Sequence, residues 1–256
     1  MLTSQQNLTA AKQTVMSKCP HSERKTQLIK SAPMDLLTSR QLDDFQENAA
    51  VFAQVNAWVK NYLARPHKDL GRPGTVCPFA PEALMRDSIR VAVVRLTRHA
   101  ESEIEAAVDH FRQVFHELEP SSGDGAIYKA ILMAFPDVSL ADAPRLIDVC
   151  KERLKPEFVR EGLMLGEFHE LNESPGLHNP DFRPLRCPVP LLAIRHMVYS
   201  DIVFLNRPTD PIDRRIRFLE AYLNPRNALR PQDREAANLF LAELRQIAAA
   251  EPVPVT

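Results

Sequence analysis

The sequence lacks the short motifs that mark many catalytic and nucleotide-binding sites. It contains no HExxH, no GxSxG, no GxGxxG and no GxxxxGK[ST] segment. These patterns accompany zinc peptidases, serine hydrolases, dinucleotide-binding folds and phosphate-binding loops respectively. Its histidines and cysteines also match no metal or nucleophile motif closely enough to name a reaction.

A large excess of charge of either sign is also absent, and the formal net charge is -1. Lys and Arg number 32, Asp and Glu number 33, and the isoelectric point is about 6.7. Proteins that bind nucleic acid or acidic membranes usually carry an excess of basic residues. We therefore expect a small-molecule substrate and neither a nucleic-acid nor a membrane partner, while the oligomeric state is left open.

Paired cysteines and long apolar runs are missing as well. The four cysteines, at positions 19, 77, 150 and 187, form no CxxC pair, so a zinc site built from them would be unusual. No run approaches the roughly 20 apolar residues that span a bilayer, and the first residues lack the apolar core of a secretory signal. We expect a cytoplasmic protein with reduced thiols.

Glycine is scarce and proline abundant, with 7 glycines against 21 prolines. Three cysteines, Cys19, Cys77 and Cys187, directly precede a proline. Proline restricts the residue before it to extended geometry, so these cysteines are expected in fixed, non-helical loops. Such Cys-Pro pairs also occur where thiolates bind haem, although coincidence in a proline-rich chain is the alternative.

The chain length and its 45% hydrophobic content suit one globular domain. We expect a flexible tail over residues 1–36, a single α+β domain over 37–248 and a short tail over 249–256. The apolar pattern predicts an N-terminal helix from near Thr38 to Leu63, two C-terminal helices, and a small mixed sheet of about five strands covered by helices. The expected strands are Ile89–Leu96, Ala126–Phe135, Leu163–Phe168, Leu191–Arg195 and Ile202–Leu205.

The most informative segment runs from Gly162 to Leu205. If Leu163–Phe168 is a strand, alternation places Glu167 and His169 on the same face, where they could form a hydrogen-bonded pair. A carboxylate beside an imidazole can serve as a general base or strengthen a metal ligand. The alternative is a solvated strand end.

Further candidates lie in two proline-rich segments. Arg195 and His196 end an expected strand, where the arginine could bind a carboxylate or form a salt bridge with Asp201 or Glu167. The loop GRPGTVCPFAP offers Cys77 as a thiol and Arg72 as a cation, and its glycines would let the backbone approach another segment closely. A rigid structural loop explains that sequence equally well. The segment 171–190, which is long for a loop without function, holds His178.

The segments GRPGTVCPFAPEAL, GLMLGEFHE and LHNPDFRPLRCPVPLLAIRHMV together resemble an uncharacterised bacterial family, a domain of unknown function sometimes found near natural-product genes. The resemblance covers roughly Leu63 to Leu205. It implies no particular activity.

A more distant similarity is to the YqcI/YcgG family, which includes haem-dependent N-hydroxylases. Cys77-Pro78-Phe79 would occupy the place of that family's Phe-Pro-Cys loop, and Gly166 to His169 the place of its glycine-histidine element. The similarity implies haem as cofactor and His169 as the axial ligand, with Cys77 as an alternative thiolate. Arg195 or Arg72 would pair with a haem propionate or a substrate carboxylate, and His196 would lie near the cofactor.

The resulting hypothesis is a haem-dependent monooxygenase acting on a small amino acid or amine in specialised metabolism. One alternative is a cofactor-free enzyme that uses Glu167 and His169, or Cys77, as its reactive groups. Another is a non-enzymatic binding or accessory protein with a partner surface formed by the proline-rich loops.

Overall fold

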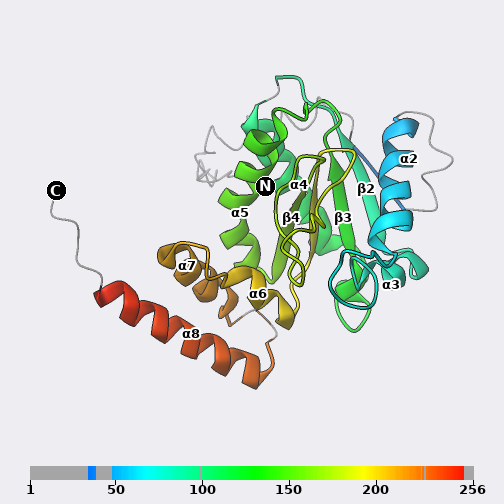
Figure 1. Ribbon diagram of the computed structural model, residues 1–256. Coiled ribbons are helices and arrows are strands. Elements are labelled where there is room, and N and C mark those ends of the chain that lie inside the picture. Colours follow the sequence, from blue (N-terminus) through cyan, green and yellow to red (C-terminus); the bar gives the residue numbers. More distant parts are fainter. Residues whose placement is uncertain (1–33, 39–47, 99, 226, 228, 251–256) are drawn as a thin grey trace, which may run out of the picture.

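The computed structural model describes residues 34–38, 48–98, 100–225, 227 and 229–250, without the side chains of residues 34–38 (Figure 1). Five strands form one sheet, in the order β1-β2-β3-β5-β4. Their bounds are β1 Met34–Thr38, β2 Ile89–Val94, β3 Ala130–Ala134, β4 Leu163–Phe168 and β5 Leu191–His196. The pairing of β2 with β3 is parallel and the other pairings are antiparallel, which confirms the expected mixed α+β sheet.

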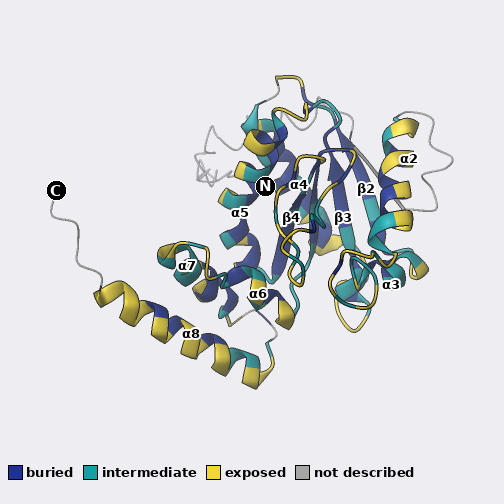
Figure 2. Cartoon of the chain, viewed as in Figure 1, coloured by how far each residue is buried: buried dark blue, intermediate teal, exposed yellow. Residues whose placement is uncertain are grey.

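Helices cover both faces of this sheet. One face packs against α4 (Glu101–Glu117), the π-helical turn η4 (Pro144–Asp148) and α5 (Val149–Arg160), around a core that includes Phe111, Phe115 and Ile147. The other packs against α2 (Ala49–Trp58), the turn η2 (Val59–Leu63) and α3 (Ala80–Met85). Figure 2 shows the central strands buried between these layers. Burial on both faces explains why β2 and β3 are almost entirely apolar.

Two of the predicted strands differ in the structure: one is a helix and the other is shorter than expected. Ile202–Leu205, which we expected to be a strand, is the short helix α6, entered through the 3₁₀ turn η5 (Tyr199–Asp201). A four-residue apolar run has too little length for its period to distinguish strand from helix, and Asp201 settles the outcome by accepting the backbone N–H of Val198 at 2.8 Å. Ala126–Phe135 is a strand only over β3, because Ala126–Tyr128 forms the 3₁₀ turn η3.

The ends of the chain follow the prediction in part. The predicted N-terminal helix is described over α2 and η2, whereas residues 39–47 lie outside the described residues. Strand β1 begins at Met34, before the expected domain start at residue 37, and residues 1–33 and 251–256 lie outside the described residues. The two predicted C-terminal helices are α7 (Ile212–Tyr222) and α8 (Pro231–Ala250).

Candidate functional site

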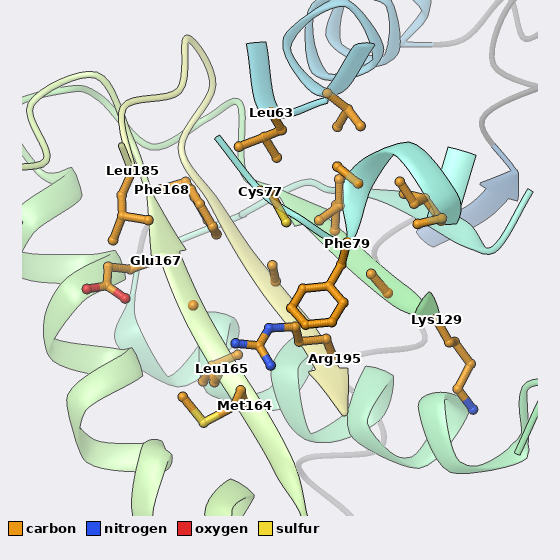
Figure 3. A pocket seen from close by; sticks show the side chains of 18 of the residues that line it. Leu63, Cys77, Phe79, Lys129, Met164, Leu165, Glu167, Phe168, Leu185 and Arg195 are labelled. Atoms are coloured by element: carbon orange, nitrogen blue, oxygen red, sulfur yellow. The ribbon is translucent and has the colours of Figure 1, made fainter. Parts of the chain in front are cut away.

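A largely apolar cavity of about 230 Å³ opens on the sheet face covered by α2 and α3, close to the edge strand β4. Aliphatic and aromatic side chains form most of its wall, and Figure 3 shows many of them converging between the sheet and the loop before α3. Its charged and reactive lining residues come from six segments of the chain: Cys77, Lys129, Lys151, Lys155, Glu167, Arg195 and Arg207. Concave apolar sites with a few polar groups are the usual form of small-molecule sites.

Strand β4 forms one side of the cavity, because every second residue of the strand faces it. Met164 and Phe168 flank Gly166, which has no side chain to fill the space between them. A Cβ atom at Gly166 would lie only 3.2 Å from the Phe168 ring. Because β4 is an edge strand, side chains of α5 on the other face also reach the cavity past its open edge.

The loop before α3, residues 64–79, is called the Cys77 loop and places Cys77 and Phe79 in the cavity wall. Its ends are joined by the backbone hydrogen bonds Val76 N–H to Arg65 O and Cys77 N–H to Leu63 O, both 2.9 Å. Gly71, with φ +76°, lies so close to the loop 171–190 that a Cβ atom there would be 2.5 Å from the His178 carbonyl oxygen. The expected close backbone approach is therefore observed.

The loop 171–190 is held against α2 and η2. Trp58 Nε1 donates to the Arg186 carbonyl oxygen at 2.9 Å, and the Trp58 ring meets Phe168 edge-on at 5.2 Å. The Tyr62 hydroxyl donates to the carbonyl oxygens of Arg183 and Pro184 at 3.4 and 3.3 Å. Trp58, the only tryptophan in the sequence, thus links this loop to the cavity that it lines.

Arg195 lies at the centre of the cavity wall, beneath Phe79 (Figure 3). Its guanidinium donates to both carboxylate oxygens of the buried Asp201, at 2.8 and 2.7 Å. The salt bridge to Asp201, one of the two alternatives for this arginine, is therefore the one that the structure contains. Its charge is already balanced, so it positions α6 relative to β5.

Lys151 and Glu167 form a buried ion pair at 3.0 Å, and Lys151 also pairs with Glu152 at 2.8 Å. Burial by itself would lower the pKa of Lys151, but the charges of Glu167 and Glu152 outweigh it and raise that pKa. Lys151 is therefore a stable ammonium group.

Lys155, one helical turn further along α5, has a different environment. Its Nζ donates to the Phe204 carbonyl oxygen at the end of α6, at 3.0 Å, and lies 4.4 Å from the centre of the Phe218 ring. No carboxylate forms an ion pair with it among the described residues. Burial, and after it the charge of Lys151, lowers the pKa of Lys155 to about 8. Roughly a fifth of this amine is therefore neutral at about pH 7.4, far more than for an exposed lysine.

The third lysine of the cavity, Lys129, contributes its stem alone. Its Nζ points away from Arg195 and Phe79 (Figure 3) and donates to the carbonyl oxygens of Phe115 and Leu118 at 2.8 and 2.6 Å. These carbonyls belong to the end of α4, where such groups need outside donors. Lys129 is a helix-capping residue.

The structure does not bring Glu167 and His169 together as a hydrogen-bonded pair. Glu167 bonds Lys151, whereas His169 Nε2 lies 3.0 Å from an Asp148 carboxylate oxygen. His169 is fully buried, its Nδ1 has no hydrogen-bond partner among the described residues, and it lies outside the cavity wall. Burial raises the pKa of the Asp148 carboxyl against the opposing effect of His169.

Two further predicted residues also lie away from the cavity wall. His196 follows Arg195 on β5 and so faces the opposite side of the sheet, with its ring edge-on to Phe115 at 4.9 Å. Burial, followed by the charges of Lys129 and His116, lowers the pKa of His196 to about 4. Arg72 closes its own loop by donating to the carbonyl oxygens of Pro73 and Val76.

The residues implied as haem contacts do not fit a haem in this arrangement. His169 and His196 do not line the cavity, Arg72 is bound within its loop and Arg195 is paired with Asp201. Cys77 alone of the implied ligands lines the cavity, whose volume of about 230 Å³ lies below the roughly 300–1,000 Å³ of drug-sized ligand pockets. Across the described part of the chain, no three His, Cys, Asp or Glu side chains are grouped as a metal site would require.

The comparison with protein families matches residues 52–234 to a domain of unknown function, DUF6875. The match spans more than half of the chain. The chain belongs to this family. DUF6875 carries no assigned activity in its description, and no curated protein and no solved structure matches the chain. In the described residues, no helix combines the length and the apolar character needed to cross a membrane.

The DUF6875 match covers every residue of the cavity wall, including Lys151, Lys155 and Arg207, which sequence reasoning missed. The spacing of Lys151 and Lys155 does place them on one helical face, which is a detectable signal. Their burial at a sheet edge could not be anticipated, because paired lysines on a helix are normally solvated.

Proposed function

We propose that this protein binds a small carboxylic acid with an apolar body in the cavity between the Cys77 loop, β4 and α5. The observation that carries the proposal is the presence of two cations in an apolar wall, Lys155 and Arg207, with which no described carboxylate forms an ion pair. Among the other charged residues of the wall, Lys151 pairs with Glu167 and Arg195 with Asp201. Lys129 directs its Nζ to two carbonyl oxygens at the end of α4.

An anionic ligand is favoured there by elementary electrostatics. Interactions between charges are stronger in a water-poor environment than in bulk solvent, and a buried cation without a counterion is destabilising. The Arg207 guanidinium lies 5.5 Å from the centre of the Phe204 ring. Within the described part of the chain no carboxylate pairs with it, so it can bind the carboxylate of a ligand. Arginine is well suited to this role because its planar fork binds carboxylates in bidentate fashion.

The apolar body of the ligand would contact the opposite part of the wall. Met164, Phe79 and Leu63 line it, and the Phe168 ring, which packs over Gly166, adds a flat aromatic surface. A volume of about 230 Å³ restricts the ligand to small molecules. We therefore infer a ligand of the size of an aromatic or medium-chain carboxylic acid.

Fluorescence of Trp58 provides the test, because the single tryptophan lines the cavity. Titration with hydrocinnamate should change the emission in a saturable way, whereas phenylpropanol, the matching alcohol, should bind about tenfold more weakly. Arg207→Gln should weaken hydrocinnamate binding by about tenfold. The matched control is Arg217→Gln, which changes an exposed arginine of α7 and should have no effect.

Equal affinity for the acid and the alcohol, or equal loss in both arginine variants, would contradict the proposal. Absence of any saturable response to hydrocinnamate would contradict it as well.

The haem-dependent monooxygenase implied by the YqcI/YcgG similarity stays a prediction. It is tested by titrating the unmodified protein, the His169→Ala variant and the Cys77→Ala variant with haemin and comparing their absorption spectra. A stoichiometric Soret band that changes in one variant would support it and identify the ligand. Weak haemin binding, equal in all three proteins, would remove it.

A further inference from the structure

We propose that Lys155 is a nucleophilic lysine that forms an imine with the carbonyl group of a 2-oxo acid bound in the cavity. The inference rests on the proposed function, since the same cavity must accept the carboxylate of that acid. It extends that function by naming a substrate class and a covalent step.

The surroundings of Lys155 favour the neutral amine that such a step requires. The residue is 5% exposed, and its Nζ lies 4.4 Å from the centre of the Phe218 ring and has one described hydrogen bond, to the Phe204 carbonyl oxygen. Charged groups act on it from three segments: Lys151 and Glu152 on α5, Glu167 on β4, and Arg207 after α6. The two cations disfavour an ammonium group, and both carboxylates are already engaged by Lys151.

The other lysines of the cavity wall lack this combination. Lys151 is held as an ammonium by Glu152 and Glu167. Lys129 directs its Nζ away from the cavity and donates to two carbonyl oxygens of the α4 end. A lysine desolvated beside a second cationic group is a known way to activate an amine toward carbonyl compounds.

The substrate class follows from the two neighbouring groups. Arg207 would hold a carboxylate, and Lys155 would meet a carbonyl carbon next to it, which is the arrangement in a 2-oxo acid. The nitrogen lone pair of Lys155 attacks that carbon and the carbonyl electron pair moves to oxygen, which gives a carbinolamine. The two protons of the amine and the former carbonyl oxygen then leave together as water. A carbon–nitrogen double bond remains between Lys155 and the substrate. No oxidant or reductant is needed.

Trapping with borohydride tests the step, because hydride reduces the imine to a stable secondary amine. The full-length protein is incubated with phenylpyruvate and borohydride, and the adduct is located by peptide mass mapping. We expect one adduct per chain, at Lys155, exceeding labelling of the exposed Lys60 by about tenfold or more at pH 8. The yield should rise with pH to a midpoint near 8, the pKa of Lys155.

Two variants complete the design. Lys155→Arg keeps a cation and a hydrogen-bond donor but cannot form a stable imine, so it should lose the adduct. Titration of the unmodified protein with hydrocinnamate, which has no keto group, measures carboxylate binding separately. Lys60→Arg should behave as the unmodified protein. Phenylacetaldehyde, which lacks the carboxylate, should give a lower yield than phenylpyruvate.

Each outcome separates the two proposals. Hydrocinnamate binding without an adduct, or with an adduct spread over exposed lysines, would overturn the imine and leave the proposed function standing. A specific adduct at Lys155 without hydrocinnamate binding would support a nucleophilic Lys155 but overturn carboxylate binding, and with it the 2-oxo acid as the substrate class. Absence of both would overturn both.

Discussion

Lys155 and His196 are basic side chains whose burial disfavours the charged form. Lys155 lies at the sheet edge beside a ligand-sized cavity, whereas His196 lies on the other face of the sheet against Phe115. At both positions the unfolded chain binds a proton more readily than the folded protein does. Stability must therefore depend on pH at both residues, over different pH ranges.

Replacing Lys155 by methionine should stabilise the fold. Folding lowers the pKa of Lys155 from 10.5 to about 8, because burial penalises the ammonium form. With respect to this residue, the free energy of unfolding is therefore highest above pH 10.5 and decreases as the pH falls to 8. At pH 7 the buried charge is fully penalised, and Lys155→Met should raise the free energy of unfolding by about 1–2 kcal/mol after the lost hydrogen bond to Phe204 is subtracted. Urea denaturation at pH 7 and pH 10 measures the gain, which should shrink at pH 10. A loss of stability at pH 7 would show that Lys155 serves the fold alone.

His196 should make the protein sensitive to mild acid. Folding lowers the pKa of His196 from 6.5 to about 4. With respect to this residue, the free energy of unfolding is therefore highest above pH 6.5 and decreases as the pH falls toward 4. We expect His196→Leu to reduce the stability lost between pH 7 and pH 5 by about 1 kcal/mol, allowing for partial solvent screening. Urea denaturation at both pH values measures this. The control variant is His178→Gln, which removes an exposed histidine outside the core.

At the scale of elements, the Cys77 loop and the loop 171–190 support each other. They meet at Gly71 and His178, and Trp58 and Tyr62 hold the second loop against α2 and η2 by bonds to its backbone. Together these contacts enclose the cavity on the side away from the sheet. The proline content of both segments reduces the entropy lost on folding.

Gly71→Ala should disrupt this loop contact. The new Cβ would lie 2.5 Å from the His178 carbonyl oxygen at a residue with φ +76°, so we expect a loss of about 2–4 kcal/mol in the free energy of unfolding. Gly123→Ala is a matched control with φ +78° and no atom within 4 Å of the added Cβ, and should cost about 1 kcal/mol. Equal losses in urea denaturation would mean that the loop contact contributes nothing beyond backbone strain.

At the scale of the whole molecule, burial is concentrated in the sheet and falls off toward the C-terminus. The central strands are buried on both faces, whereas α8 buries only Ala237, Leu241 and Leu244 among its described residues (Figure 2). Its contacts are chiefly with α7, through a small cluster around Leu219. Local stability should follow the same gradient.

Amide hydrogen exchange followed by mass spectrometry tests that gradient. Peptides from β2, β3 and β5 should exchange slowest, and those from α8 should exchange at least about tenfold faster because opening α8 exposes little apolar surface. Hydrocinnamate should slow exchange in the Cys77 loop and α5 and leave α8 unchanged. Protection of α8 equal to that of β3 would show that the helix unfolds only with the sheet.

The sequence by itself determined the mixed α+β class, four of the five strands and both C-terminal helices, because apolar periodicity is a local property of the chain. It also placed Cys77 in a fixed loop and Glu167 at a strand end.

Tertiary structure decided the rest. Glu167 pairs with Lys151 and His169 with Asp148, and Arg195 takes Asp201 as its partner, because distances between elements select among many possible ion pairs. The burial of Lys155 arises only where α5 passes the open edge of β4, and no local pattern encodes that approach. The helix that covers a sheet edge decides which charged side chains are buried there. These side chains are therefore selected by contacts between residues that are distant in the sequence.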